Sequence, residues 1–445
     1  MNLRRVLPAV PLFFSCYLLA QSTSATPKTT LLKAGRLLNV RTGQYLLNAG
    51  VLIENDKIKE VGPFPDVQAH AAKGASVIDL GEATLLPGLI DCHAHLLDAM
   101  GPREPGDNVL QTVAGMSPSA RALLGARMAR EDLEGGFTSV RVVGHSGVDG
   151  DIALRDAINA GWVPGPRIVA AGRKLTPPGG QAVRLNPAVA DVILEQEFLQ
   201  VSGADEARKA VRVNLAYGAD VIKVVADAGD RFITTEEMKA IVEEAHRSHA
   251  KIAVHARTAV SVKVAVDAGA DSIEHGNGIT DEDLKVMREK GLFYDLTETF
   301  DGKRLRQWLL KSVVFSPQDE ERVSAWEKNS IDEAVPRIQR ILKSGVKFAA
   351  GSDMWFEYPG KTRGEATALM FEALRDLGVP SADILRAATV NAAELLGWQD
   401  KVGAIEPGKL ADIIATSDDP LRDITTLQHV RFVMKGGVVV KNDPQ

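Results

Sequence analysis

The stretch LLPGLIDCHAHLLD, residues 85–98, places two histidines directly after a run of apolar residues. Residues 85–90 are typical of a buried strand, which leads into His93 and His95. Side chains alternate between the two faces of a strand, so both imidazoles are expected on one face and Cys92 on the other. Two imidazoles about 7 Å apart along one face can converge on a single ion. The pair predicts a metal site. The alternative is a chance repeat, and the other patterns in the sequence distinguish between these two interpretations.

Length and charge limit the class of protein. The chain has 445 residues, of which 45% are hydrophobic and 25% charged, and its net charge is −6. This length allows two or three domains, or one large barrel with an appendage. The chain has no run of Lys and Arg, which argues against nucleic acid or an anionic membrane surface as a partner.

The N-terminus has the layout of a secretory signal peptide. Two arginines precede an apolar run over 6–20, and small residues follow it. We expect 1–25 to be removed after Ala25 and the protein to be secreted or periplasmic. A membrane anchor is the alternative, but the run is short and contains two prolines. Cleavage would remove Cys16 and leave Cys92 as the only cysteine, so no intrachain disulfide could form.

Two β-rich ends enclose a middle of different character. Residues 26–84 and 401–445 contain short alternating segments separated by turn residues, which predict strands that pair into one β-sandwich domain. In residues 85–400 short apolar strands alternate with helical patterns, which predicts a parallel sheet. Eight strand candidates favour a closed (β/α)8 barrel of the TIM type, with a doubly wound open sheet as the alternative. They are TLLPGLIDCHAH, FTSVRVVG, PRIVAAG, ADVIKVVA, KIAVHA, DSIEHG, GLFYDLT and VKFAAGSD.

Polar residues gather at the ends of these candidate strands, where a barrel has its active site. Each histidine alone is more often structural than a ligand, but five of the nine histidines lie at or just past a strand end. The positions are His93, His95, His145, His255 and His275, together with Lys223 and Asp353. Imidazole and carboxylate ligands suit zinc and related divalent metals.

Lys223 lies inside an unbroken apolar run, where burial of an ammonium group is costly. One interpretation is that the side chain reaches the rim of the barrel and stays in water. The other is that its amine is carboxylated, which makes it an anion whose two oxygens can bridge two metal ions.

The chain resembles the amidohydrolase superfamily, in particular its imidazolonepropionase-like and Xaa-Pro dipeptidase-like branch, which includes secreted amidases that hydrolyse ochratoxin. LLPGLIDCHAH, GADVIKV, VHA, SIEHG and GSD match the family's metal-ligand motifs in order. Residues 364–397 and VGAIEPGKLADIIATSDDPLRDI match its C-terminal signature. The similarity covers nearly all of the chain after the signal segment, and it implies the same barrel with a β-sandwich built from both chain ends.

The resemblance implies a binuclear metal centre. Its ligands would be His93, His95 and Asp353 for the more buried ion, His255 and His275 for the other, and carboxylated Lys223 between them. Such a site would make hydroxide from a bridging water and polarise the scissile carbonyl. Asp353 would take the proton of the water and deliver it to the leaving amine, and His145 would donate a hydrogen bond to the carbonyl oxygen or oxyanion.

Two loops depart from the family pattern, so the substrate is less defined than the metal site. DMWFEYPGK follows the aspartate, and EHGNGIT lacks the tyrosine that often follows the fourth histidine. Four loop cations could bind a substrate carboxylate, although a solvated loop charge is the simpler interpretation of each. They are Arg103, Arg173, Lys174 and Arg304.

These features predict an enzyme that hydrolyses an amide or peptide bond, with dipeptides, N-acyl amino acids or ochratoxin-type amides as substrates. The first alternative is a cyclic-amide or ester hydrolase (an imidazolonepropionase, a lactonase or a phosphotriesterase-like enzyme) with the same metals. An inactive barrel that acts as a binding protein is the alternative of another class. Association into a homo-oligomer stays open.

Overall fold

The computed structural model describes residues 28–443 except 99–107, 182–184, 300–302, 305–306, 308–316 and 356. The expected signal segment, with Cys16, lies outside the described residues, as does Arg103. Within the described part of the chain, no helix is both long and apolar enough for a membrane span.

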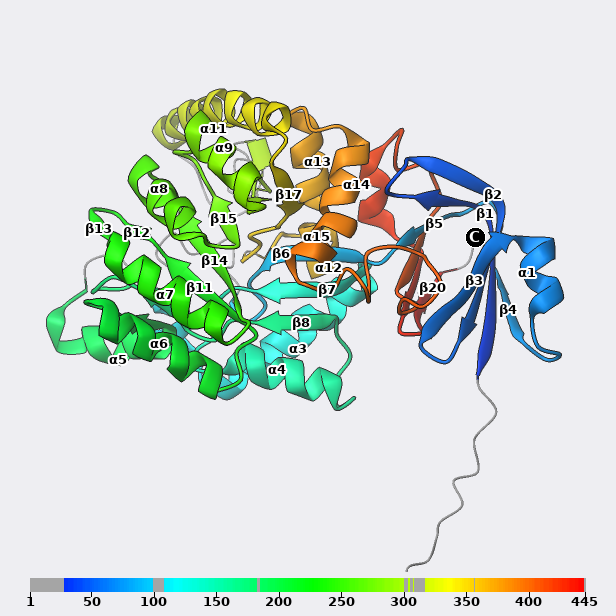
Figure 1. Ribbon diagram of the computed structural model, residues 1–445, viewed down its shortest axis with the longest axis horizontal. Helices are drawn as coiled ribbons and strands as arrows, with labels where there is room; N and C mark the ends of the chain where they lie inside the picture. Colours follow the sequence, from blue (N-terminus) through cyan, green and yellow to red (C-terminus); the bar gives the residue numbers. More distant parts are fainter. Residues whose placement is uncertain are drawn as a thin grey trace, which may run out of the picture.

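The two chain ends form one sheet, drawn in blue and red in Figure 1. Its N-terminal strands are β1 (Thr29–Asn39), β2 (Gln44–Glu54), β3 (Lys57–Pro63), β4 (Ser76–Asp79) and β5 (Thr84–Pro87). Its C-terminal strands are β18 (Ile413–Thr416), β19 (Phe432–Lys435) and β20 (Val438–Asn442). The order is β20-β19-β18-β5-β1-β2-β3, with β4 beside β1, and helix α1 (Phe64–His70) lies against β2 and β3. The pairing of both ends agrees with the expectation, while the domain boundaries stay a prediction.

The opening stretch of the sequence joins this sheet to the barrel. We expected residues 84–95 as a single strand, but they form β5 and then β6 (Leu89–Ala94), separated at Gly88. β5 lies between β1 and β18 in the small sheet, whereas β6 pairs with a barrel strand. Proline cannot donate to a ladder, which suits Pro87 to the end of a strand.

Eight parallel strands form the barrel: β6, β7 (Phe137–Val142), β8 (Arg167–Ala170), β11 (Val221–Val225), β14 (Lys251–Ala256), β15 (Ser272–His275), β16 (Phe293–Leu296) and β17 (Lys347–Ala350). Hydrogen bonds close the two seams between the ladders. Asp353 N donates to His93 O at 2.8 Å beside β17 and β6, and Asp220 N donates to Ala170 O at 2.8 Å beside β11 and β8. The closed barrel predicted from the sequence is confirmed. Two short strands, β9 (Lys174–Thr176) and β10 (Phe198–Gln200), extend the wall after β8.

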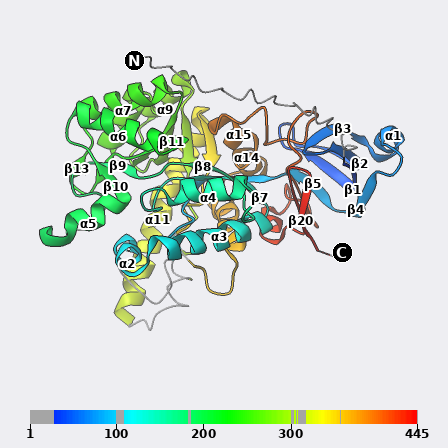
Figure 2. The same ribbon diagram turned by 90° about the horizontal axis from the view of Figure 1, so that it is seen from below.

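Helices surround the barrel (Figures 1 and 2). They are α2 (Asn108–Gly115), α3 (Pro118–Glu134), α4 (Gly150–Asn159), α5 (Pro187–Glu197), α6 (Ala204–Ala216), α7 (Thr235–Arg247), α8 (Ala259–Ala268), α9 (Asp281–Lys290), α11 (Pro317–Ser344), α12 (Arg363–Thr367), α13 (Leu369–Asp376), α14 (Ser381–Ala387) and α15 (Val390–Leu395). Three consecutive helices, α7 to α9, begin with a threonine N-cap in a capping box, at Thr234, Thr258 and Thr280. Each cap satisfies backbone N–H groups that have no partner within the helix.

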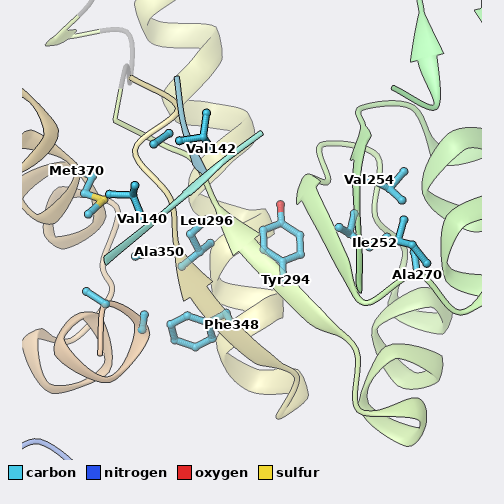
Figure 3. Packing of buried hydrophobic residues seen from close by; sticks show 14 of the residues in the cluster. Val140, Val142, Ile252, Val254, Ala270, Tyr294, Leu296, Phe348, Ala350 and Met370 are labelled. Atoms are coloured by element: carbon cyan, nitrogen blue, oxygen red, sulfur yellow. The ribbon is translucent and has the colours of Figure 1, made fainter. Parts of the chain in front are cut away.

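Alternation along the strands separates an apolar outer face from a polar interior. Figure 3 shows outward residues of β7, β14, β16 and β17, among them Val140, Val142, Tyr294 and Leu296, packed as one buried cluster. The residues between them face the barrel interior, where Arg141 contacts side chains of other strands. The same period of two therefore builds the core and directs polar groups inward.

Gly88 lets the small sheet meet the barrel, because a Cβ there would lie 2.2 Å from Thr138 Oγ1 and 2.5 Å from Thr138 Cγ2. Gly88→Ala should therefore lower the free energy of unfolding by about 1–3 kcal/mol, measured by urea denaturation. Adding Thr138→Ala should recover part of that loss. Gly115→Ala is the control, because nothing lies within 4 Å of a Cβ at that position. Equal stabilities for the Gly88 and Gly115 variants would contradict this account.

Candidate metal centre

All seven polar residues expected at the barrel mouth line one cavity of about 100 Å³. They are His93, His95, His145, Lys223, His255, His275 and Asp353, and the cavity is also lined by Lys174, Gln181, Arg257 and Trp355. The volume suits a few groups of the size of water, so it can enclose a reacting group and its ligands rather than a whole drug-sized molecule.

Asp353 lies among three of the imidazoles. Its Oδ1 is 3.2 Å from His95 Nε2 and 3.6 Å from His93 Nε2, and its Oδ2 is 3.8 Å from His275 Nδ1. Burial alone would raise the pKa of this carboxyl, but His93 and His95 hold it well below its ordinary value. His93, His275 and Asp353 each offer a ligand atom within 4.8 Å of the others. The carboxylate is therefore placed to share an ion with neighbouring imidazoles.

Hydrogen bonds orient three imidazoles through their Nδ1 atoms and leave Nε2 for a ligand. The pairs are His93 Nδ1 with Glu274 Oε2 at 2.6 Å, His95 Nδ1 with Gly144 O at 2.9 Å, and His275 Nδ1 with Thr297 Oγ1 at 2.8 Å. Partners of this kind fix the tautomer and the ring orientation of metal-binding histidines.

His255 is oriented through its other nitrogen. Its Nε2 lies 3.5 Å from Asp227 Oδ1, which leaves Nδ1 for a ligand. Asp227 is held in turn, because its Oδ2 accepts from the backbone N–H groups of Arg257 at 2.8 Å and Thr258 at 2.9 Å. The rings of His255 and His275 have centroids 4.5 Å apart, so these two histidines form a second set within the cavity.

Burial keeps these imidazoles in the form that binds metals. Loss of solvent lowers the pKa of His93 to about 3 and that of His255 to about 4, and it holds the pKa of His275 well below its ordinary value. They are neutral at neutral pH as a result, and a neutral imidazole has a free lone pair.

Lys223 is buried rather than placed at the rim. Its residue is 2% exposed, and Nζ lies 3.4 Å from His93 Nε2. The interpretation of a side chain that reaches solvent is therefore wrong. Among the described residues no carboxylate forms an ion pair with this amine. Burial lowers the pKa of Lys223 to about 8, so about a tenth of the amine is neutral at pH 7.

The donor set fits divalent metal ions. Four imidazoles, a carboxylate and a buried lysine supply nitrogen and oxygen donors in one cavity, and each imidazole has a second nitrogen besides the one whose contact orients its ring. A second cluster, His93, Glu274 and Asp295, also has ligand spacing. Arg141 already occupies it, because its Nη2 donates to both carboxylates at 2.9–3.0 Å. That cluster supports the metal centre from beneath.

Three of the cavity residues have left-handed backbone conformations that residues other than glycine adopt at a cost. The φ angles are +56° at His145, +67° at His275 and +47° at Asp353. Such strain persists where the surrounding structure enforces it and is concentrated at functional sites. In β15 it also lets His275 join the cavity directly after Glu274, although neighbouring strand residues normally face opposite sides.

β6 departs from regular alternation. Asp91 and Ala94 pair with Val140 and Val142, so β6 has one more residue than β7 across this interval. His93 and His95 nevertheless meet, with ring centroids 5.3 Å apart. Cys92 packs in a hydrophobic cluster with residues of β16, β17 and α15.

Two of the four basic residues noted after the strands are buried and are not the expected solvated loop charges. Lys174 lies in strand β9 and is 1% exposed, and its Nζ lies 2.9 Å from His145 Nε2 and 2.6 Å from Gln181 Oε1. Arg304 is also buried, with Asp376 3.0 Å away. Burial lowers the pKa of Lys174 to about 7, although the charge of Glu197 acts in the opposite direction. A strand of three residues has too short an apolar pattern to be recognised in the sequence.

Three residues that line the cavity are not identified in the sequence analysis; they are Trp355, Arg257 and Gln181. Arg257 stands two residues past His255, so a closer reading of the strand end VHAR could have found it. Gln181 belongs to a loop whose fold brings it to Lys174, and no local pattern indicates that contact.

Asp91 ties β6 to the segment that carries Asp353. Its Oδ1 accepts from His93 N at 3.0 Å and Ser352 N at 2.8 Å, and its Oδ2 accepts from Ser352 Oγ at 2.6 Å. Arg363 adds a second link, because it donates to the carbonyl oxygens of His95 and Met354.

Asp91→Ala should remove these three hydrogen bonds and lower the free energy of unfolding by about 3 kcal/mol, because buried N–H groups lose their acceptor. Bound metal should fall with it, since the ligands on both segments lose their alignment. Asp91→Asn keeps an acceptor for the two N–H groups and should retain most of both properties. Thermal melts and metal analysis of the three proteins test this, and an alanine variant equal to the parent protein would refute it.

Comparisons with known proteins place this geometry in a family. The model of the amidohydrolase family matches residues 84–440. The chain is 28% identical to ochratoxinase from Aspergillus niger, over 93% of this chain and 87% of that protein. It is 26% identical to imidazolonepropionase from Symbiobacterium thermophilum, over 92% and 94%.

Two solved structures support the same placement. A Xaa-Pro dipeptidase with methionine bound in its active site is 30% identical, with a TM-score of 0.78 over 92% of this chain and 99% of that one. A prolidase complexed with N-methylphosphonate-L-proline is 27% identical, with a TM-score of 0.78 over 93% and 100%. With the family match spanning the whole barrel, these likenesses show that the chain belongs to the amidohydrolase family, as an enzyme that hydrolyses carbon–nitrogen bonds.

Proposed function

We propose that this enzyme cleaves the amide or peptide bond of dipeptides or N-acyl amino acids and releases the C-terminal amino acid. Support comes from its likeness to a Xaa-Pro dipeptidase with bound methionine, to a prolidase with a phosphonate derivative of proline, and to ochratoxinase. Ochratoxin-type amides fall within the same substrate class.

The convergence of six potential ligands in one cavity carries the proposal. His93, His95 and Asp353 would hold one ion, and His255 and His275 the other. Lys223 would stand between them as a carbamate, formed when its neutral amine adds to carbon dioxide and releases a proton. The buried amine has no ion-pair partner among the described residues, so a change from cation to bridging anion would resolve an unfavourable burial. Zinc is the metal that this ligand set favours.

The chain's own groups then divide the proton transfers. When bound, the two ions would supply Lewis acidity toward the carbonyl and lower the pKa of water. Asp353 would accept the proton of the attacking water and deliver it to the leaving nitrogen, a role for which its place among the ligands suits it. His145 would stabilise the carbonyl oxygen as charge develops on it. Its Nε2 faces Lys174, while its Nδ1 is buried without a hydrogen-bond partner among the described residues.

A cyclic-amide or ester hydrolase is the second candidate. The observation that favours it is the likeness to imidazolonepropionase across 92% of this chain.

The proposed site of action is outside the cytoplasm, because residues 1–25 have the layout of a signal peptide.

Metal content tests the proposed centre. The purified protein should contain about two divalent ions per chain, and Lys223→Ala should lose metal and activity together because the bridge is gone. Cys92→Ser is the matched control, since Cys92 lies on the same stretch as His93 but packs in the apolar cluster. Inductively coupled plasma mass spectrometry gives the stoichiometry. Fewer than one ion per chain in the parent protein, or an active Lys223 variant, would overturn the binuclear proposal.

A substrate panel tests the reaction class. N-acetyl amino acids and dipeptides should be hydrolysed with kcat/KM at least about tenfold above lactones, phosphotriesters and cyclic amides of similar size, a difference of about 1.4 kcal/mol in transition-state stabilisation. Removal of the metals with a chelator should abolish all of these activities, and added zinc should restore them. If turnover is confined to cyclic amides or esters, the second candidate replaces the first.

A further inference from the structure

Lys174 is a buried cation in the wall of the metal cavity, and the proposed reaction leaves it without a role. Its residue is 1% exposed, and its Nζ contacts only two neutral groups that the structure describes, His145 Nε2 at 2.9 Å and Gln181 Oε1 at 2.6 Å. An ammonium has three N–H donors, so one donor remains after these contacts.

The cavity has an excess of positive charge. Apart from Lys223, which the proposed function makes an anion, the cations Lys174 and Arg257 line it, whereas Asp353 is the one carboxylate among its described lining residues. A buried cation without a counter-ion is costly, and an anionic ligand that enters such a cavity removes the cost. This charge distribution favours a ligand with a carboxylate over its uncharged analogue.

The position of the ammonium group is fixed before any ligand arrives. A Cβ on Gly144 would lie 2.5 Å from Lys174 Cγ, so the lysine stem runs directly against the backbone beside His145. The Nζ also lies 5.1 Å from the centre of the Phe198 ring. Because packing already restrains this side chain, binding an anion would cost it little rotamer entropy.

The distance from the reacting atoms suits a substrate carboxylate. In an N-acyl amino acid one carbon atom separates the scissile amide nitrogen from the carboxylate, so this group must lie beside the metal centre. A single imidazole separates Lys174 from the ligand set, because His145 contacts Lys174 and its ring centroid lies 4.9 Å from that of His95.

We propose that Lys174 binds the α-carboxylate of the substrate and makes the enzyme select free carboxylates over carboxamides. This assignment rests on the proposed amide hydrolysis, and it identifies Lys174 as a residue that determines the specificity of that reaction. Arg257 lines the same cavity but is exposed, so water already solvates its charge and a carboxylate gains less from it.

The test pairs each N-acetyl-L-amino acid cleaved by the enzyme with its C-terminal carboxamide and follows acetate release. The unmodified enzyme should prefer the carboxylate by about 100-fold in kcat/KM, the scale expected for a buried charged contact. Lys174→Met, which keeps the stem and removes the charge, should lose that preference mainly through a higher KM for the carboxylate, with the carboxamide little changed. Arg257→Met is the comparator and should keep the preference, and metal analysis should show two ions in every variant.

Several outcomes would overturn the assignment. If the unmodified enzyme cleaves both members of each pair equally, the assignment of Lys174 is overturned but the proposed amide hydrolysis still stands. This measurement does not depend on how a variant folds. An equal fall in kcat on both substrates for Lys174→Met would instead assign the lysine to the oxyanion or to positioning His145. Loss of the preference in Arg257→Met alone would move the carboxylate to the rim. If no pair is cleaved at all, the proposed function fails and this assignment fails with it.

Discussion

The amine of Lys223 lies in the interior of a parallel barrel, 3.4 Å from His93 Nε2, where water cannot stabilise its charge. This burial is the constraint on which the site depends, because it disfavours a cation there more than the nearby carboxylates of Glu274, Asp353 and Asp295 favour one. Burial likewise keeps the imidazoles of His93 and His255 neutral, while His93 and His95 keep Asp353 ionised. Both effects produce the protonation states that bind a divalent cation, so the electrostatics of the cavity favour a metal centre.

A second layer of polar groups holds this arrangement rigid. Arg141 links the Glu274 carboxylate that orients His93 to Asp295 on the next strand, and Asp91 joins the first and last strands of the barrel. Each connection crosses between strands that are far apart in the sequence. The closure of the barrel therefore sets the positions of the residues at its mouth, including Asp353 and His145 in the loops that follow the strands.

Much of this could be predicted from the sequence, because apolar strands and the polar residues at their ends are local patterns. The eight strands, the β-rich chain ends and seven of the residues that line the cavity could be predicted from such patterns. The close approach of Thr138 to Gly88 could not be predicted, since Thr138 lies on another strand. The sequence predicts a loop charge at Lys174 for a similar reason, because only the folded chain shows that this residue lies in β9, buried against Gly144. The support from Arg141 likewise joins residues over 130 positions apart.

The central claim is that two divalent ions bind at the barrel mouth on either side of a carboxylated lysine. Anomalous diffraction from crystals of the purified enzyme, collected above and below the absorption edge of zinc, tests it most directly. The account predicts two anomalous peaks in the cavity, one beside His93, His95 and Asp353 and one beside His255 and His275, with electron density that continues beyond Lys223 Nζ toward both. A single peak, or none, with density for Lys223 that ends at its Nζ would contradict it.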